Sequence, residues 1–367
     1  MATLFDYLNW RGDLSFTEAP LCEVDSLIFS MLSYIDLSEI VPEGHTDAAI
    51  PIRAAANAFL AQHPDTDKVS LGLFIPKNIL QLFLAAKETR RFRNVEIRAY
   101  VNHVDHAREM QFSATTYLID GVGAVIAYRG TDDTLIGWKE DFNMCFMPEI
   151  PAQSEATAYL NAAAAASPTL PLYLTGHSKG GNLAVWAAMH ATDATKSRMV
   201  RVWCNDGPGF YEGTLDDPNY IEISPMIQYF VPQGTVVGLL LEHSSRYTVV
   251  KSRQVGVLQH DGMTWEVMGN SFVCMEDVTD GSKRIDRTMR EWLKKMNTEQ
   301  RTQFVDALYQ LIASDKSLTL TDLANWRNLG NFKKLLTLDP EVRQALQRLI
   351  SILLDAHRKK PTYKALP

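Results

Sequence analysis

Cysteine is scarce in this sequence, which has only four among 367 residues, at Cys22, Cys145, Cys204 and Cys274. The four lie far apart and form no Cys-x-x-Cys pair. This spacing excludes the usual patterns of a zinc site and of a small domain stapled by disulfides. We interpret the cysteines as reduced and mostly buried thiols.

An excess of positive charge is also missing. Lysine and arginine total 36 against 43 aspartate and glutamate residues, which gives a formal net charge of −7 and a pI near 5.7. A chain of this kind has no general basic field to gather polyanions. Nucleic acid is therefore not an expected partner.

Long apolar runs are absent as well. No run approaches the roughly 20 residues that a membrane-spanning helix needs, and the Ala-rich run 162–166 is part of an expected helix. The opening residues include Asp6 and lack a basic region ahead of an apolar one, unlike a secretory signal peptide. We expect no transmembrane segment and a cytoplasmic location.

Helices are expected where apolar residues recur at helical spacing, and strands where short β-branched or aromatic runs occur. The expected helices are Glu23 to Tyr34, the single candidate in the first 50 residues, then Ile52 to Gln62, Ile79 to Arg90, Ser154 to Ala166 and Asn182 to Ala191. The expected strands are Val95 to Val101, Thr115 to Asp120, Gly123 to Tyr128, Leu170 to Leu174, Val200 to Cys204, Ile227 to Val231 and Tyr247 to Val250. Strands that alternate with helices indicate the α/β class, with a mostly parallel sheet covered on both faces.

The pattern becomes helical throughout after Arg284. The expected segments are Arg284 to Lys295, Thr298 to Ala313, Leu320 to Arg327 and Pro340 to His357. The turn-forming residues 280–282 mark a weak boundary, which divides a domain at 1–281 from a C-terminal helical region at 282–367; helices from about 1–92 would pack on the first domain. The C-terminal helices offer a surface for a partner or a second copy of the chain, or they form a satellite bundle on the sheet.

The chemistry concentrates at residues 176–180, which read Gly-His-Ser-Lys-Gly. This segment follows an apolar strand and opens an Ala-rich helix, which is the setting of a nucleophile elbow. A sharp turn there would project Ser178 as a nucleophile, while the Lys179 N–H could donate to an oxyanion. The simpler interpretation is a loop with Ser178 as a helix N-cap. A phosphate-binding loop fits poorly, because its Gly-x4-Gly-Lys-Ser/Thr spacing is missing.

A second segment, Tyr-Arg-Gly-Thr at 128–131, ends an earlier strand. In hydrolases with a nucleophile elbow, an earlier strand end supplies the second oxyanion donor. Thr131 carries both a backbone N–H and a hydroxyl that suit this role. An ordinary turn after a strand would explain Thr131 equally simply.

These segments together resemble the successive signatures of class 3, or fungal-type, lipases. The resemblance rests on residues 128–131, 138–142 and 176–181, and on His-Asp-Gly-Met-Thr-Trp at 260–265. The opening residues 5–13, which read Phe-Asp-Tyr-Leu-Asn-Trp-Arg-Gly-Asp, are similar to a bacterial family of lipase-related, Mbeg-like proteins. The resemblance implies an α/β-hydrolase fold and a serine hydrolase that cleaves carboxylic esters.

Carried over by position, the resemblance makes Ser178 the nucleophile, His260 the general base and acid, and Thr131 and Lys179 the oxyanion donors. The order of the chain also allows this choice, because His260 follows the last expected strands. A surface-turn histidine is the plainer interpretation of His260, and His243 is the rival base. His103, His106 and His177 are weaker candidates.

The acid departs from the class 3 pattern. That family has an Asp just after the strand at 228–231, where this chain reads Pro-Gln-Gly-Thr-Val-Val-Gly at 232–238. Two other carboxylates are candidates. We prefer Asp206, because a strand end at the same sheet edge as Ser178 can orient His260, and Glu242 is the alternative. An Asx turn ahead of Gly207 would account for Asp206 nearly as well.

The segment Thr134 to Met147 mixes apolar residues with Lys139, Glu140 and Asp141. The corresponding stretch of lipases is a mobile lid, which suggests an ester of an apolar acyl group as substrate. A core-facing helix would have the same composition. No metal or organic cofactor is required by the expected acyl transfer.

Two functions of different classes follow from the sequence. The first is an active esterase or lipase-like serine hydrolase. The second is a catalytically silent α/β-hydrolase scaffold that binds a ligand or a protein, because the usual acid is missing and Lys179 stands where lipases usually have an apolar residue. Fold alone does not decide between the two.

Overall fold

The structure is a computed structural model that describes residues 1–45, 48–69, 71, 75–132, 137, 140–141, 143–144, 146–295, 297, 299–300, 303, 340 and 344. Within these residues, nine strands form one mixed sheet in the order β1-β2-β3-β4-β5-β6-β7-β8-β11. The strands are β1 Ile50–Pro51, β2 Glu96–Asp105, β3 Met110–Ile119, β4 Gly123–Tyr128, β5 Leu172–His177, β6 Met199–Asn205, β7 Ile227–Pro232, β8 Thr248–Val250 and β11 Cys274–Met275. A separate pair consists of β9 Val267–Met268 and β10 Ser271–Phe272.

The centre of the sheet is parallel. Strands β4 to β8 run parallel to one another, whereas β1, β2, β3 and β11 pair with their neighbours in the antiparallel direction. Helices connect the parallel strands, with α6 Pro151–Ala166 between β4 and β5 and α7 Lys179–His190 between β5 and β6. The carboxyl ends of β4, β5 and β6 therefore meet at one edge of the sheet, where ligands bind in open α/β folds.

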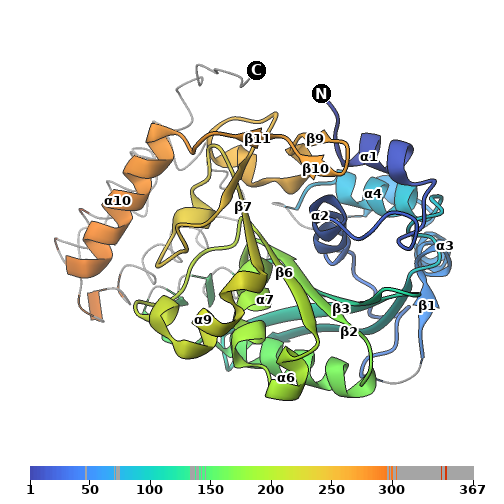
Figure 1. Cartoon of the computed structure of the whole chain (residues 1–367), viewed down its shortest axis with the longest axis horizontal. Helices are drawn as coiled ribbons and strands as arrows, with labels where there is room; N and C mark the ends of the chain where they lie inside the picture. Colours follow the sequence, from blue (N-terminus) through green and yellow to red (C-terminus); the bar gives the residue numbers. More distant parts are fainter. Residues whose placement is uncertain are drawn as a thin grey trace.

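Helices cover both faces of this sheet (Figure 1). The remaining helices are α1 Leu4–Arg11, α2 Glu23–Leu32, α3 Ile52–Gln62, α4 Asn78–Ala86, the short α8 Asp193–Lys196, α9 Pro218–Ile223 and α10 Asp280–Lys295. One apolar core joins α1 to α4 to Val125 and Ala127 of β4, and a second core joins α6 and α7 to Ile126 and Tyr128. Alternate side chains of β4 thus enter opposite cores, as the pleat of a strand buried on both faces requires.

The predicted fold class is confirmed, and most expected helices and strands are present. The expectation of a single helix in the first 50 residues was wrong, because α1 precedes α2. Reciprocal hydrogen bonds between Thr3 and Asp6 form a capping box, and Leu4, Tyr7 and Leu8 bury one side of this short helix. Only two turns long, α1 gives a weak periodic signal.

At the C-terminal end, α10 confirms the helix expected at Arg284 to Lys295 but begins earlier, at Asp280. The proposed domain boundary at 281 falls in its first turn, and the division into two domains stays a prediction. The helices expected at 298–313, 320–327 and 340–357 lie outside the described residues apart from single positions. Among the helices that are described, none combines the length and apolar character needed to span a bilayer.

Candidate active site

Ser178 lies at the turn between β5 and α7 with φ 58° and ψ −134°. Residues other than glycine rarely adopt these backbone angles, and they do so where the surrounding structure holds them in place. The turn is tight, because a Cβ atom at Gly180 would lie 2.1 Å from the Tyr128 carbonyl oxygen and one at Gly176 would lie 2.1 Å from the Gly180 carbonyl group. Glycine at both positions is what a nucleophile elbow requires.

A buried polar network supports the elbow from the α2 side. The Asn205 amide donates to the Ser30 hydroxyl at 3.3 Å, to the Thr175 hydroxyl at 3.4 Å and to the Gly176 carbonyl at 3.3 Å. The Ser30 and Thr175 hydroxyls are themselves 2.8 Å apart. In addition, the Ser178 N–H donates to the Asn205 carbonyl at 3.0 Å. These bonds fix the ends of β5 and β6 against α2.

Asp206 follows β6 directly and has a positive φ of 49°. Its Oδ2 accepts a hydrogen bond from His260 Nδ1 at 2.7 Å, and the carboxylate is fully buried while the imidazole is 29% exposed. Because an ionised carboxylate only accepts, His260 carries its proton on Nδ1 and leaves Nε2 free to take another. Asp206 and His260 thus have the geometry of the acid and the base of a triad.

The loop after β7 supplies the other partners of Asp206. The Thr235 hydroxyl donates to Asp206 Oδ1 at 2.5 Å, and the Gly238 N–H donates to the same oxygen at 3.1 Å. This is the loop in which the class 3 pattern would place the acid. Here it holds a carboxylate that comes from the preceding strand.

His260 ends the short 3-10 helix Gly256–His260, and its neighbours anchor it. The Gln259 side chain accepts the Gly234 N–H at 2.8 Å, and the Gln259 carbonyl accepts the indole N–H of the fully buried Trp265 at 2.9 Å. The imidazole is therefore presented from a segment fixed on two sides.

His177, which the sequence ranked low, contacts His260. Its Nε2 lies 2.7 Å from the His260 carbonyl oxygen, its Nδ1 lies 3.3 Å from the Tyr34 hydroxyl, and the two imidazole rings are 4.6 Å apart. Burial, with a smaller effect from His260, lowers the pKa of His177 to about 3. His177 is consequently a neutral ring that donates from Nε2, and it positions the backbone of His260.

Together, these contacts connect Ser178 to His260 and Asp206 through the residues next to it in sequence. His177 joins Ser178 in sequence and His260 in space, and Asn205 links the Ser178 N–H to Asp206. Among the described residues the structure gives no hydrogen bond between the Ser178 hydroxyl and His260. Catalytic hydrogen bonds of ligand-free enzymes are often long and shorten when substrate binds.

The other candidates lie elsewhere. Glu242 Oε2 accepts the N–H groups of Gly213 at 2.8 Å and Leu215 at 3.4 Å, so this carboxylate holds a surface loop. His243 bonds the Ser244 carbonyl and lies 3.6 Å from Asp286 of α10. Neither side chain is bonded to the Asp206–His260 pair.

Thr131 approaches Ser178 from the end of β4. Strands β4 and β5 pair Tyr128 with Gly176, and a Cβ atom at Gly130 would lie 3.1 Å from Ser178 Cβ. The Thr131 hydroxyl donates to Asp141 Oδ2 at 2.5 Å. Burial raises the pKa of Asp141 to about 6, against the opposing effects of Lys179 and Thr131.

The side chain of Lys179 is buried inside the protein. Its fully buried ammonium donates to Glu140 Oε2 at 2.9 Å and to the Gln111 carbonyl and side-chain oxygens at 2.9 and 2.8 Å. The sequence predicted a role in the site only for the backbone N–H of Lys179, and its side chain was a departure from the apolar residue usual in lipases. Of the expected lid at 134–147, half of the residues lie outside the described part of the chain, and the lid stays a prediction.

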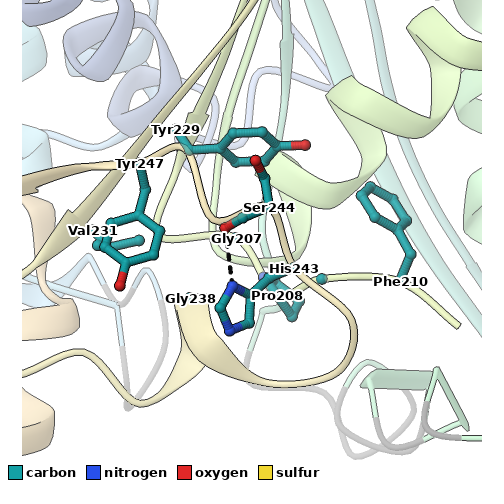
Figure 2. Close-up of a pocket in the computed structure, with 10 residues that line it drawn as sticks. Gly207, Pro208, Phe210, Tyr229, Val231, Gly238, His243, Ser244 and Tyr247 are labelled. Carbon is teal, nitrogen blue, oxygen red and sulfur yellow. Dashed lines mark hydrogen bonds between the residues drawn. The ribbon is translucent and has the colours of Figure 1, made fainter. Parts of the chain in front are cut away.

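A small pocket lies beyond the Asp206 loop (Figure 2). Its lining includes Gly207, which follows Asp206, together with Tyr229, His243 and Tyr247. Figure 2 shows the two tyrosine rings and the His243 imidazole around this space. Neither Ser178 nor His260 lines the pocket, so it neighbours the site without containing its reactive groups.

A parallel sheet centre with crossing helices, a strained serine at a strand-to-helix turn, and the chain order serine, aspartate, histidine define an α/β-hydrolase fold. A family model described as Mbeg1-like matches residues 86–310, more than half of the chain. The chain belongs to the Mbeg1-like family, and the expected family is thereby confirmed.

Three solved structures illustrate its similarity to lipases. A fungal lipase–inhibitor complex described as a model for interfacial activation is 13% identical, covers 71% of this chain and 86% of its own, and has a TM-score of 0.40. The native Rhizomucor miehei lipase propeptide complex is 14% identical, with 70% and 87% coverage and a TM-score of 0.36. Lipase II from Rhizopus niveus is 12% identical, with 48% and 72% coverage and a TM-score of 0.31. No match was found among curated proteins.

Proposed function

We propose that this protein is a serine hydrolase that cleaves carboxylic esters of apolar acyl groups through an acyl-enzyme on Ser178. The observation that carries the proposal is the 2.7 Å hydrogen bond between His260 Nδ1 and the buried Asp206 carboxylate, next to the strained turn of Ser178. A nucleophile, a base oriented by hydrogen bonding and a buried acid are the three groups that acyl-transfer enzymes of this type use.

In the acylation step, Ser178 Oγ attacks the ester carbonyl carbon and gives its proton to His260 Nε2. The carbonyl oxygen becomes an oxyanion, which the Lys179 N–H and the Thr131 N–H stabilise, while the Thr131 hydroxyl gives its one hydrogen to Asp141. The C–O bond to the alcohol then breaks, and the alcohol leaves with the proton held by His260. Asp206 keeps the imidazole in the correct tautomer and stabilises its charged form.

In the deacylation step, a water molecule gives one proton to His260 Nε2 as its oxygen attacks the acyl carbon. The bond to Ser178 Oγ breaks, and the serine recovers the proton from His260. One ester and one water molecule give one acid and one alcohol. The chain's own residues suffice for every proton transfer in this sequence.

The apolar acyl group in this proposal is supported by the sequence of residues 134–147. The segment is rich in apolar residues and contains Asp141, whose carboxylate bonds the Thr131 hydroxyl. Short and medium p-nitrophenyl esters, from acetate to decanoate, are suitable substrates to compare.

The test is labelling by a fluorophosphonate probe together with hydrolysis of these esters. We expect labelling of the wild type, none of Ser178→Ala, and strongly reduced labelling of His260→Ala. The matched controls are His243→Ala, which removes the rival histidine, and His103→Ala, which removes an exposed one bonded to Glu43. Both controls should label like the wild type.

Folded wild type that takes no label and hydrolyses none of the esters would overturn the proposal. That result would favour a catalytically silent scaffold that binds a ligand or a protein. Labelling of the wild type that persists in Ser178→Ala would show that a different nucleophile reacts.

A further inference from the structure

The side chain of Lys179 forms an internal connection that the proposed acyl transfer does not itself use. A buried ammonium needs compensation for the hydration that it loses. Here all three N–H bonds have acceptors, two on Gln111 of β3 and one on Glu140. Both charged side chains of the pair are 0% exposed.

Glu140 uses both of its carboxylate oxygens. Oε2 accepts from Lys179 and from the Gln111 N–H at 3.1 Å, and Oε1 accepts the Ala152 N–H in the first turn of α6 at 2.9 Å. The N-terminus of a helix favours a negative group at this place. One carboxylate thereby joins α7, β3 and α6.

The neighbour of Glu140 reaches the oxyanion side of the site. Asp141 follows Glu140 in the chain, and its Oδ2 accepts the Thr131 hydroxyl at 2.5 Å. A threonine hydroxyl rotates freely until an acceptor fixes its hydrogen. Since Glu140 has three hydrogen-bond partners, it fixes the position of the adjacent Asp141. The bond from the Thr131 hydroxyl to Asp141 then holds Thr131 in place, and the Thr131 backbone N–H is the group that stays free to donate to an oxyanion.

We infer that the buried Lys179–Glu140 pair positions Thr131 as an oxyanion donor, through the segment 140–141, and that Lys179 thus couples the nucleophile turn to both oxyanion donors. This inference rests on the proposed function. Lys179 contributes its backbone N–H to the oxyanion site, while its side chain acts at a distance as a positioning group.

The test variants are Lys179→Met, which keeps the backbone N–H and the length of the side chain, and Glu140→Gln, which keeps the shape of its side chain. We expect each to lower kcat for ester hydrolysis by about 10- to 100-fold, less than complete removal of one oxyanion donor. KM should stay within about twofold, because the interaction is made in the transition state.

Lys196 provides a matched control. It is also a buried lysine, with Glu222 at 2.8 Å and Asn219 at 2.9 Å, but it lies in α8, away from the proposed site. Lys196→Met should lower thermal stability, by less than Lys179→Met because its partner Glu222 is 57% exposed, yet keep kcat within about twofold of the wild type, since distant sites act independently. A general loss of stability would move both variants alike.

The decisive measurement is a double-mutant cycle with Thr131→Val. If Lys179 acts through the Thr131 hydroxyl, Lys179→Met should cost less than about threefold in kcat once that hydroxyl is gone, because coupled residues are not additive. An equal cost in both backgrounds overturns the inference. So does a wild-type kcat in Glu140→Gln, which keeps the inference testable should Lys179→Met fail to fold.

The outcomes separate this inference from the proposed function. Wild type that is neither labelled by the fluorophosphonate nor active on esters overturns both. Wild type that is labelled at Ser178, with Lys179→Met and Glu140→Gln labelled at the same rate, overturns the role of the buried pair alone.

Discussion

On one side of Ser178, neutral groups hold the Asp206–His260 pair: the Thr235 hydroxyl and the Gly238 N–H bond the carboxylate, and the His177 ring bonds the His260 backbone. On the other side, Thr131 bonds a charged cluster, made by the half-buried Asp141 and the fully buried Glu140 and Lys179. The two sides therefore differ in how much free energy is lost when one partner is removed. Neutral donors stabilise a carboxylate without further charge, whereas each buried charge of the second cluster needs its partner.

The two sides therefore differ in what disturbs them. The acid–base side should fail when the tautomer of His260 is lost. The oxyanion side should respond to pH and to any change that leaves a charge unpaired.

The largest effect is expected for Asp206→Asn. The amide cannot orient the His260 tautomer as a carboxylate does. In serine proteases, the same change in the triad aspartate lowers kcat about 10⁴-fold. We expect a loss of about 10³- to 10⁴-fold in kcat for p-nitrophenyl ester hydrolysis. The absorbance of released p-nitrophenol, followed over a range of substrate concentrations, gives kcat and KM for both proteins.

Glu242→Gln is the control for Asp206→Asn, since Glu242 holds the loop at Gly213 and Leu215. It should leave kcat within about twofold, as substitutions without shared partners do. The assignment of the acid would be wrong if Glu242→Gln lost the larger share of activity. Equal activity of both variants with the wild type would reduce the triad to a dyad.

A second effect concerns stability and pH at Asp141. Its pKa is raised to about 6 from an unfolded value near 3.8, so the folded protein binds this proton more tightly. The contribution of Asp141 to stability is therefore present below about pH 4 and lost as the pH rises toward 6. Asp141→Asn, which does not titrate, should gain in stability relative to the wild type over that window, by at most about 1.4 kcal/mol per pH unit.

Urea unfolding of both proteins at pH 4 and pH 7 tests this sign. Because Asp141 is still 22% exposed, the gain should fall below the upper bound. If Asp141→Asn instead lost stability relative to the wild type as the pH rises from 4 to 7, the raised pKa of Asp141 would be contradicted. The same variant should lose activity, since an amide accepts the Thr131 hydroxyl less strongly than a carboxylate.

The smallest effect is expected at Tyr34, which bonds His177 at 3.3 Å. Tyr34→Phe removes one neutral hydrogen bond and should cost about 0.5–1.5 kcal/mol of stability. His177 itself has a pKa of about 3, against 6.5 for an ordinary histidine, so its contribution to stability is present above about pH 6.5 and is lost as the pH falls toward 3. The pH dependence of unfolding should thus have opposite signs for His177 and Asp141.

His177→Gln checks the sign at His177. The wild type should be more stable than this variant by a margin that narrows as the pH falls from about 6.5. A margin independent of pH would mean that His177 titrates alike in the folded and unfolded chain.

Much of the fold follows from local sequence signals. The strand Gly123–Tyr128 and the helix Ile52–Gln62 were predicted with their observed bounds, because β-branched runs and helical spacing are strong there. The short strands β1 and β11 were not expected, since two residues carry no period and their pairing depends on neighbours far away in sequence. The helix α1 depends on a capping box rather than on a long apolar stripe.

In the candidate site, too, local motifs could be predicted from the sequence, whereas contacts between distant segments could not. The elbow at Ser178 is a local motif, and the preference for Asp206 came from the expectation that strand ends meet at one edge. Contacts that come from distant segments gave no such signal: Thr235 to Asp206, His177 to His260, and Glu140 to Lys179. A lysine at the start of an otherwise apolar, Ala-rich helix was the one visible sign that a buried partner was needed.

The central claim is that Ser178 forms a covalent acyl intermediate. Its most direct test is mass spectrometry of the wild type quenched in acid during turnover of a p-nitrophenyl ester, followed by mapping of the modified peptide. We predict the acyl group on the peptide that contains Ser178, and an intermediate that does not form in Ser178→Ala. Ester turnover by the wild type with no acyl group on Ser178, or with the group on another side chain, would contradict this account.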